Sequence, residues 1–389
     1  MGEFKVKVEE VIQNFLNNDL DLGFRRLVDC ILDTKNLELY QKVIDFNELK
    51  YYKEFNENDF KEKCISFLNQ VSSYKIKEGL TGGNLIQANE ITKSYRNKKF
   101  QLKNVSLEIN SGDVWGIVGE NGNGKTTLLR ILAKELSYDS GTLEYHLDKN
   151  PSTERIGSLY DLRCKLVYIP QRTKKWYGSL MNNLKFTASH YGLKGKENEL
   201  TVLMYIIRFG LWEYRNFNWN ELSSGFKMRF ELARTFLRSP KVLFLDEPLA
   251  NLDILAQQTI LDDLKHLSQN ISNPIGIILS SQQLYEVEKI SDKVLFLKKG
   301  EPKLLYDENN KESKIQTIVE IDIHSISKEK LTEIRYPLPV LEINFNGGIF
   351  IIKIDQSNCI NEFLNKITSS GVQIKYFRDI SLSSRRFFK

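Results

Sequence analysis

The sequence predicts an α/β fold built around a phosphate-binding loop, with a helical domain before it and a smaller α/β domain after it. Three observations lead to this prediction. An apolar run at residues 114–118 leads into a glycine-rich loop, and residues 128–132 continue with the spacing of a helix. Residues 1–75 carry apolar side chains at helical intervals. From residue 315 onward, short stretches alternate apolar and polar side chains, as half-buried strands do.

The first part of the chain predicts a bundle of about four helices. Apolar stripes that begin at Val8, Phe24 and Phe60 recur at the helical period, with charged side chains on the opposite face. Acidic residues outnumber basic ones in residues 1–80, which argues against a nucleic-acid-binding arm. Two roles stay open: a packing extension of the following domain, or a docking module for a protein partner. The glycine-rich residues 77–84 are expected to be the linker.

The glycine-rich loop, residues 119–127, fits the pattern G-x-x-x-x-G-K-[ST]. Its glycines allow backbone N–H groups to turn toward phosphates, and the following helix directs the positive end of its dipole there. We expect Lys125 to reach the β- and γ-phosphates of ATP, and the Thr126 hydroxyl to bind Mg²⁺. The loop residues expected to bind ATP are Gly119, Asn121, Gly122, Asn123, Gly124, Lys125, Thr126 and Thr127.

A second motif is the apolar stretch of residues 241–248, which ends in two acids and a proline. An apolar run without alternation predicts a strand that is covered on both faces. Asp246 at its carboxyl end is expected to hold Mg²⁺, and Glu247 to orient or deprotonate the attacking water. Phosphoryl transfer requires mainly positioning and charge neutralisation, so one acid for the metal and one for the water suffice.

The third motif, Leu222 to Phe226, is a short serine- and glycine-containing turn at the start of a predicted helix, just upstream of the acidic strand. The order and spacing of the three motifs resemble those of ATP-binding cassette (ABC) transporter ATPase subunits of the export type. The resemblance covers about residues 85 to 300 and implies the ABC-type nucleotide-binding fold.

The resemblance assigns further residues. It implies that Tyr95 stacks on adenine and that Gln171 senses both Mg²⁺ and the coupled partner. It also implies that Ser223 and Gly225 face the γ-phosphate of ATP bound to a second chain, and that Leu252 and Asp253 form the D-loop. The expected metal-binding residues are Thr126, Gln171 and Asp246, and the expected catalytic residues are Glu247 and Gln282.

The sequence departs from the family pattern at two places. Ser224 and Phe226 replace a glycine and a glutamine of the signature, and Gln282 stands where the family has a histidine. None of the four histidines of the chain aligns with that position. Glutamine can still hydrogen-bond a phosphate or a water, but it cannot carry a proton as imidazolium does. We therefore expect ATP binding to persist and the ATPase to be active or slowed.

The C-terminal part predicts the element order βαββαβ, typical of a ferredoxin-like α/β domain. The expected elements are a strand at 319–323, a short helix near 327–334, a hairpin at 341–354, a helix from 360 to about 371, and a last strand at 372–376. A role in supporting dimerisation is favoured over ligand sensing. The end of the chain, residues 376–384, is similar to the C-terminal tails of export-type ABC ATPases.

Composition limits the remaining possibilities. The chain of 389 residues has a formal net charge of +5, which gives no basic stripe that would indicate nucleic acid as a partner. Its apolar stretches are far shorter than the ~20 residues of a membrane-spanning helix. The N-terminus is not a secretion signal, and the cysteines have no metal or redox spacing, which predicts free thiols in the cytoplasm. The expected domains are residues 1–80 (helical), 85–310 (ABC ATPase) and 315–389 (α/β).

The resulting hypothesis is a cytoplasmic ATPase subunit, peripheral on the inner face of the cell membrane, that powers an exporter through nucleotide-dependent dimerisation. It needs ATP, Mg²⁺, an integral-membrane subunit on a separate chain and a second ATPase subunit, with a homodimer expected. One alternative is a soluble ABC protein that uses ATP as a structural switch on a protein partner. Another is a degenerate subunit that binds ATP beside an active one. The transported substrate stays open between lipid, polysaccharide, peptide and drug.

Overall fold

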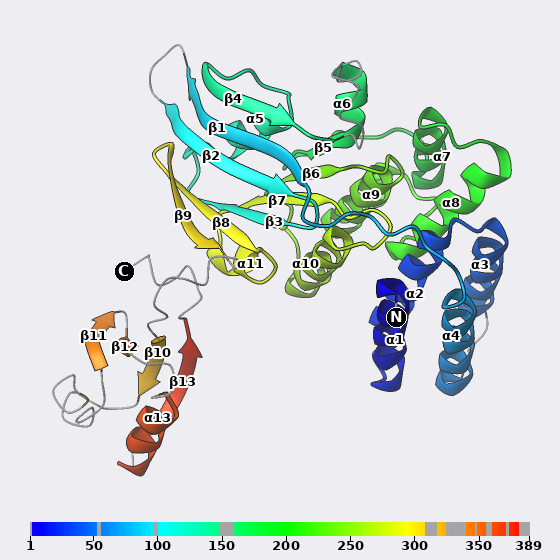
Figure 1. The fold of residues 1–389 in the computed structure, drawn as a ribbon. Helices are drawn as coiled ribbons and strands as arrows, with labels where there is room; N and C mark the ends of the chain where they lie inside the picture. Colours follow the sequence, from blue (N-terminus) through cyan, green and yellow to red (C-terminus); the bar gives the residue numbers. More distant parts are fainter. Residues whose placement is uncertain are drawn as a thin grey trace.

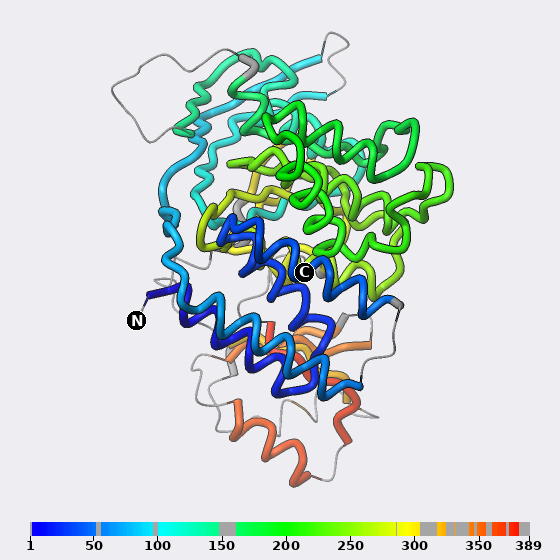
Figure 2. The backbone as a smooth tube through the Cα atoms, turned by 90° about the vertical axis from the view of Figure 1, so that its right-hand side faces the viewer, coloured from blue at the N-terminus to red at the C-terminus, as the bar shows by residue number. Residues whose placement is uncertain are grey.

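The structure is a computed structural model that describes most of the chain. The described residues are 2–52, 56–95, 100–147, 159–307, 317–323, 331, 340–346, 348–354, 360–370 and 373–380. Figures 1 and 2 show a helical bundle at the N-terminus, a central α/β body and a small α/β unit near the C-terminus. The fold class predicted from the sequence is confirmed.

A six-stranded sheet forms the centre of the α/β body, with the strand order β5-β6-β7-β3-β8-β9. Its strands are β3 (Val114–Val118), β5 (Leu166–Ile169), β6 (Val242–Asp246), β7 (Gly276–Ser281), β8 (Lys293–Lys298) and β9 (Glu301–Asp307). All neighbours are parallel except β8 and β9. Strands β3, β6 and β7 are buried along their whole length, which explains their apolar runs. Their carboxyl ends share one edge, so the segments that follow them lie together.

A second, antiparallel sheet covers one side of the body, with the order β2-β1-β4. Its strands are β1 (Asn84–Ser94), β2 (Gln101–Asn110) and β4 (Ser140–Tyr145). Helix α5 (Lys125–Leu132) follows the phosphate-binding loop, and its buried leucines and isoleucine share a core with both sheets. This packing fixes the start of α5, where the loop ends.

The remaining described helices of the body are α6 (Leu159–Lys165), α7 (Leu180–His190), α8 (Gly195–Arg208), α9 (Ser224–Phe236), α10 (Ile254–Ser268) and α11 (Leu284–Glu288). Helices α7 to α10 lie on the side of the sheet near the N-terminal bundle, whereas α6 lies beside β5 and α11 packs against β3 and β7 (Figure 1). Ser223 caps α9 and Asp253 caps α10, each by accepting a hydrogen bond from a backbone N–H in the first turn. Both helices therefore begin at residues that the family resemblance singled out.

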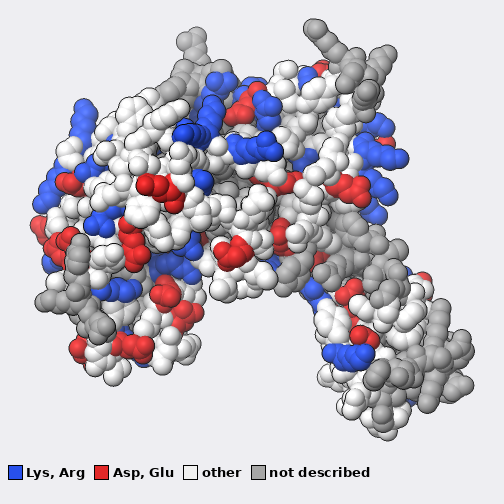
Figure 3. Space-filling view, turned by 180° about the vertical axis from the view of Figure 1, so that it is seen from behind, with Lys and Arg blue, Asp and Glu red and all other residues white. Residues whose placement is uncertain are grey.

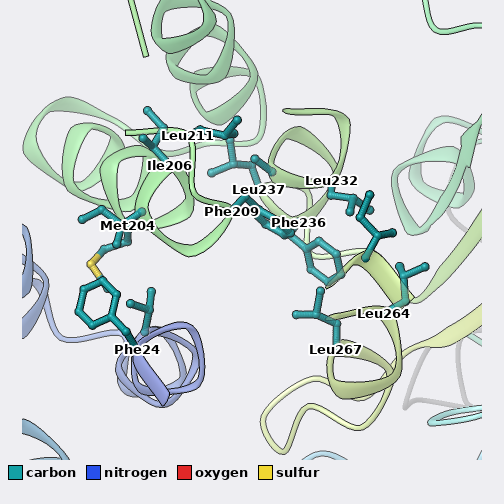
Figure 4. Close-up of a cluster of buried hydrophobic side chains, with 14 of the residues drawn as sticks. Phe24, Met204, Ile206, Phe209, Leu211, Leu232, Phe236, Leu237, Leu264 and Leu267 are labelled. Atoms are coloured by element: carbon teal, nitrogen blue, oxygen red, sulfur yellow. The ribbon is translucent and has the colours of Figure 1, made fainter. Parts of the chain in front are cut away.

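Four helices form the N-terminal bundle, as the apolar stripes predict. They are α1 (Glu3–Leu16), α2 (Leu20–Thr34), α3 (Leu37–Tyr52) and α4 (Glu57–Val71). The bundle does not have a core of its own: its buried residues belong to one cluster with those of α7 to α10. Figure 4 shows Phe24 of α2 beside Met204 of α8, with Phe209, Phe236 and the leucines of α9 and α10 continuing the cluster.

The C-terminal unit is an antiparallel sheet with one described helix. It contains β10 (Thr317–Ile323), β11 (Val340–Asn346), β12 (Ile349–Ile354), α13 (Ile360–Ser369) and β13 (Ile374–Asp379), in the strand order β11-β12-β10-β13. The second strand is separated from the first by the third, which is the split arrangement of a ferredoxin-like domain. The unit has a separate apolar core. The helix expected near 327–334 lies outside the described residues, apart from Leu331.

Charges are mixed on the surface. Figure 3 shows basic and acidic side chains interspersed among the described residues of the face opposite to that of Figure 1. Within the described part of the chain, no helix has the length and apolar character needed to cross a bilayer.

Candidate nucleotide-binding and catalytic site

The loop between β3 and α5 has a backbone that only glycine accommodates at two positions. Gly124 has φ = +100° and precedes the first residue of α5. A Cβ atom on Gly119 would lie 2.4 Å from the Leu297 carbonyl oxygen of β8. The glycines thus allow the loop to pass close to the sheet and to turn sharply into the helix.

Lys125 folds back over this loop. Its ammonium Nζ donates a hydrogen bond to the Gly119 carbonyl at 2.7 Å and lies 3.3 Å from Oε1 of Glu247. The side chain is only 5% exposed. A buried ammonium needs anionic or carbonyl partners, and here the protein provides them from the loop and the acidic strand. These partners occupy the Lys125 ammonium, which the sequence predicts to bind the β- and γ-phosphates.

Asp246 at the end of β6 is surrounded by hydroxyl groups. The Thr126 hydroxyl donates to its Oδ2 at 2.8 Å, the Tyr168 hydroxyl donates to the same oxygen at 3.0 Å, and the Ser280 hydroxyl donates to Oδ1 at 2.8 Å. Burial and the neighbouring carboxylate raise the pKa of Tyr168, so this phenol remains a donor. Asp246 is thereby held in one orientation.

These groups fit Mg²⁺. The described residues contain no cluster of three or more His, Cys, Asp or Glu side chains arranged to hold a metal. The site provides one carboxylate and one hydroxyl within 2.8 Å of each other, Asp246 and Thr126. Mg²⁺ prefers oxygen ligands and takes most of its coordination from water and substrate phosphates, so few protein ligands suffice.

Glu247 is the point at which the other predicted residues meet. The amide Nε2 of Gln171 donates to its Oε2 at 2.8 Å, and Nε2 of Gln282 lies 3.1 Å from Oε1 and 3.0 Å from Oε2. Its backbone N–H donates to the Ser280 hydroxyl at 3.0 Å, and its φ of +48° is in the left-handed region. A cavity of about 210 Å³ lies beside Glu247 and Gln282.

Tyr95 lies near the loop from the other sheet. Its hydroxyl is 3.3 Å from the Thr127 hydroxyl, and its ring is tilted against Phe100 with centroids 6.3 Å apart. The side chain is 41% exposed. The sequence therefore identified an accessible aromatic ring beside the phosphate-binding loop, which is the geometry that a base-stacking residue requires.

The signature residues Ser223 and Gly225 have other partners than the groups around Glu247. The Ser223 side chain caps α9 by accepting from the Phe226 N–H at 3.4 Å, and Gly225 lies against Ala256 and Leu252 of the D-loop region. Within the described residues, neither is bonded to the groups around Glu247. The two departures from the pattern have local roles. The Ser224 hydroxyl donates to the Asn251 carbonyl at 2.7 Å. The ring centroids of Phe226 and Tyr214 are 3.9 Å apart.

Comparison with known proteins identifies the family. Residues 102–250 match the ABC transporter family. The uncharacterized ABC transporter ATP-binding protein YxlF of Bacillus subtilis is 30% identical over 218 residues, which are 56% of this chain and 69% of that protein. The chain belongs to the ATP-binding proteins of ABC transporters. The resemblance to ATP-binding proteins of ABC transporters is confirmed, whereas the export type stays a prediction.

Two further comparisons extend this result. This ABC ATPase is 27% identical over 250 residues to the phosphonates import ATP-binding protein PhnC of Mesoplasma florum, covering 60% of this chain and 99% of the relative. The chain therefore carries segments that this relative lacks. The structure of CbiO1 from Clostridium perfringens, part of the ABC transporter complex CbiONQ, has a TM-score of 0.51 and 26% identity, covering 57% of this chain and 88% of that one.

Two residues of the site escaped the sequence analysis. Ser280 contacts both Asp246 and the backbone of Glu247, and Tyr168 donates to Asp246. Both had a signal. Ser280 is the next-to-last residue of the apolar strand β7, two positions before Gln282, and Tyr168 is the next-to-last residue of β5, which leads to Gln171. Parallel strands bring these positions to the same edge as Asp246, and only the strand order shows that β6 lies between β5 and β7.

Proposed function

We propose that this ABC ATPase hydrolyses ATP to drive a membrane exporter, and that two copies close around two ATP molecules. The observation that carries the proposal is the set of bonds on Glu247, which joins Lys125, Gln171 and Gln282 at one carboxylate. Two neutral amides and one ammonium hold this carboxylate in one orientation and place a compensating charge beside it. Those are the properties that a residue positioning an attacking water needs.

Each residue of the site then has a role. Lys125 exchanges its loop carbonyl and carboxylate partners for the β- and γ-phosphates, while the loop N–H groups bind the phosphate chain. Thr126, Asp246 and Gln171 hold Mg²⁺, which neutralises phosphate charge when bound. Glu247 positions or deprotonates the water, and Gln282 donates its amide N–H to the carboxylate or the phosphate.

A second copy completes the site. Ser223 and Gly225 at the start of α9 belong to no cluster around Glu247 in their own chain, which supports a role in trans. Ile254 and Leu255, which follow the D-loop, are 72% and 75% exposed and favour burial against another chain. Nucleotide at the interface would hold the two copies together, and hydrolysis would release them.

The membrane subunit is expected to bind the segment that follows Gln171. Tyr177 is 81% exposed and Phe186 of α7 is 70% exposed, which makes them suitable for burial against a partner. Phe217 adjoins them, since the Leu180 N–H donates to its carbonyl. In the same segment Leu180 is buried and Trp176 packs on Phe230, so neither side chain belongs to the proposed surface.

The export direction rests on the C-terminal stretch. Residues 376–380 begin the segment that is similar to the tails of exporter ATPases, and the described part ends with Ile380 fully buried. The relatives named above include a protein that is named for import. Transport assays with the cognate membrane subunit in inverted vesicles would decide the direction by the sense of ATP-dependent substrate movement.

The first test is ATP hydrolysis by the full chain, together with its Glu247→Gln variant. We expect Mg²⁺-dependent turnover that Glu247→Gln abolishes, and an ATP-dependent dimer of Glu247→Gln in light scattering. Glu144→Gln, at an exposed position, is the matched control and should keep wild-type turnover. A chain that binds ATP yet stays monomeric and inactive in every variant would contradict the proposal.

Co-purification separates the exporter from the alternative of a soluble switch. Detergent extraction and capture of the full chain should retain an integral-membrane protein. The same capture with Tyr177→Ala and Phe186→Ala should lose it while ATP binding persists. Recovery of a soluble complex through the N-terminal bundle, with no membrane protein, would favour the switch on a protein partner.

A further inference from the structure

A large cavity lies between the N-terminal bundle and the body, away from the nucleotide loop. Its volume is about 700 Å³, and its walls come from α2, α3, the segment that follows α8, and helices α9 and α10. Pockets that bind small molecules have volumes of about 300–1,000 Å³. Aromatic rings form much of the wall, including Phe24, Trp212, Tyr214 and Phe226. The cavity therefore has the size of a small-molecule site, and its wall combines aromatic rings with charged side chains.

The wall contains a buried network with more cations than anions. Asp263 of α10 lies 2.8 Å from Arg25, 3.2 Å from Arg26 and 3.2 Å from Arg208. Asp29 accepts from Arg208 at 2.5 Å. Three guanidinium groups thus share two carboxylates. His266 contacts Asp29 but adds no charge to this network. Burial lowers the pKa of its imidazole to about 4, so the ring is neutral.

Two further cations line the cavity from opposite sides. Arg229 of α9 is half-buried over the Phe226 ring at 5.5 Å, and burial lowers its pKa. Lys50 of α3 lies over the rings of Phe24 and Phe60 at 4.8 and 4.6 Å. Among the described residues, no carboxylate lies within ion-pair distance of either cation. Both cations lie over aromatic rings, and Arg229 interacts with Asp263 and Asp253 only beyond ion-pair distance, so an anion between the two cations would be stabilised.

The carboxylates that line the cavity do not cancel its preference for an anion. Asp263 is engaged by three arginines, and the other two acids, Asp21 and Glu213, are exposed. Exposed charges are screened by water, whereas half-buried ones are screened much less. The partly buried part of the wall, which includes Arg229 but not the exposed Lys50, is consequently cationic and aromatic.

We propose that this cavity binds a small organic oxyanion, in which a carboxylate, phosphate or sulfonate is carried on an aromatic or apolar body. The oxyanion lies between Arg229 and Lys50, and the body lies against Trp212 and Phe226. Such a ligand bridges α3 of the bundle and α9 of the body. It touches α9 one turn after the residues Ser223 and Gly225 at its start.

The test uses anilinonaphthalene sulfonate, a fluorescent aromatic sulfonate, with the full chain. We expect saturable binding of one probe per chain. Arg229→Gln and Lys50→Gln should each weaken the affinity about tenfold, because each removes one charge-assisted contact. Lys227→Gln on α9 and Lys42→Gln on α3 are matched controls, since neither residue lines the cavity, and they should bind as the wild type does. The uncharged analogue phenylnaphthylamine should bind at least tenfold more weakly.

Other outcomes overturn the proposal. Equal binding of the charged and uncharged probes, or unchanged affinity in Arg229→Gln and Lys50→Gln, would leave no oxyanion recognition in the cavity. Displacement of the probe by ATP, or its loss in Lys125→Ala, would assign the signal to the nucleotide site. Circular dichroism of each variant should match the wild type, and Lys50, which is exposed, provides a test that does not depend on core packing.

Discussion

At the residue scale, the proposed hydrolysis of ATP depends on how one carboxylate is held. Glu247 has a left-handed backbone, with φ = +48°, which costs a non-glycine residue about 1 kcal/mol or more. The bond from its N–H to the Ser280 hydroxyl offsets that cost, and the amides of Gln171 and Gln282 orient the side chain. Gln282 thus supplies one function of the missing histidine, hydrogen bonding, but not proton transfer.

Gln282→Ala should lower kcat at least tenfold and leave KM for ATP within about twofold, because it removes the two contacts that orient Glu247 but none with the phosphate loop. Gln282→His should raise turnover above wild type, and its rate should vary with pH around the imidazole pKa, about 6.5. Steady-state ATP hydrolysis measures both. Gln283→Ala is the neighbouring control, and an equal loss there would refute a specific role of Gln282.

Lys125→Ala should abolish nucleotide binding, because the substitution removes the buried cation that faces the loop carbonyls and Glu247. Titration with a fluorescent ATP analogue measures the loss, which we expect to be at least a hundredfold in Kd. Lys134→Ala, just after α5, should bind normally. Wild-type affinity in Lys125→Ala would refute the assignment of the loop.

At the scale of elements, helix α2 joins two parts of the body. Its Asp29 binds Arg208 at the end of α8, and its Arg25 and Arg26 bind Asp263 of α10. Burial works to raise the pKa of Asp29, but Arg208, His266 and Arg26 together outweigh it, so the pKa lies well below its ordinary value. The network therefore ties α8, which leads to the signature segment, to α10, which follows the D-loop.

Arg208→Leu should lower the free energy of unfolding by about 3–5 kcal/mol, since it leaves Asp29 and Asp263 without their shared buried cation. Urea denaturation followed by circular dichroism measures the change. Arg25 is partly exposed, and its partner Asp263 keeps two other arginines. Arg25→Gln should therefore lower the free energy of unfolding by less than half as much. Equal effects of the two substitutions would show that burial of the network does not determine its contribution.

The pH dependence of stability should report His266. Burial lowers the pKa of its imidazole to about 4 from an ordinary value of 6.5. Between these values the unfolded chain binds more protons than the folded one, so stability falls as the pH decreases from about 6.5 to 4, by about 3 kcal/mol. Comparing wild type with His266→Gln isolates this contribution. A wild-type profile parallel to that of His266→Gln in this window would contradict the assignment.

At the scale of the whole molecule, the two flanking units differ in how they depend on the body. The buried residues of the N-terminal bundle belong to the same cluster as those of α7 to α10, whereas the C-terminal unit has its own core. Figure 4 shows the shared cluster, in which Phe24 of the bundle meets Met204 of the body. The shared cluster fits a packing extension of the ATPase domain, which is one of the two roles that the sequence leaves open for residues 1–80.

Removal of residues 1–75 should therefore expose a large apolar surface and give an aggregated or unfolded chain. Removal of residues 317–389 should leave a folded protein that binds ATP, because the core of the C-terminal unit is separate. Size-exclusion chromatography and ATP titration of both truncations measure this. A soluble, ATP-binding chain that lacks residues 1–75 would contradict the shared core.

The sequence by itself determined the nucleotide machinery. The loop 119–127, the acids Asp246 and Glu247 and the residue Gln282 were each recognisable because each belongs to a short motif of neighbouring residues. Helices and strands followed from apolar periodicity for the same reason. These local patterns were sufficient for the fold class, and the family was recognised from the order of the motifs.

The tertiary structure alone decided what brings distant residues together. Arg208 and Asp29 are 179 residues apart in the sequence, and Arg26 and Asp263 are 237 apart. No spacing pattern in the sequence therefore predicts their ion-pair network. The same holds for Ser280 beside Asp246, for the shared core of the bundle and for the cationic cavity. Such contacts arise when apolar faces pack and strands take their order in a sheet, and burial then selects which charges must be paired.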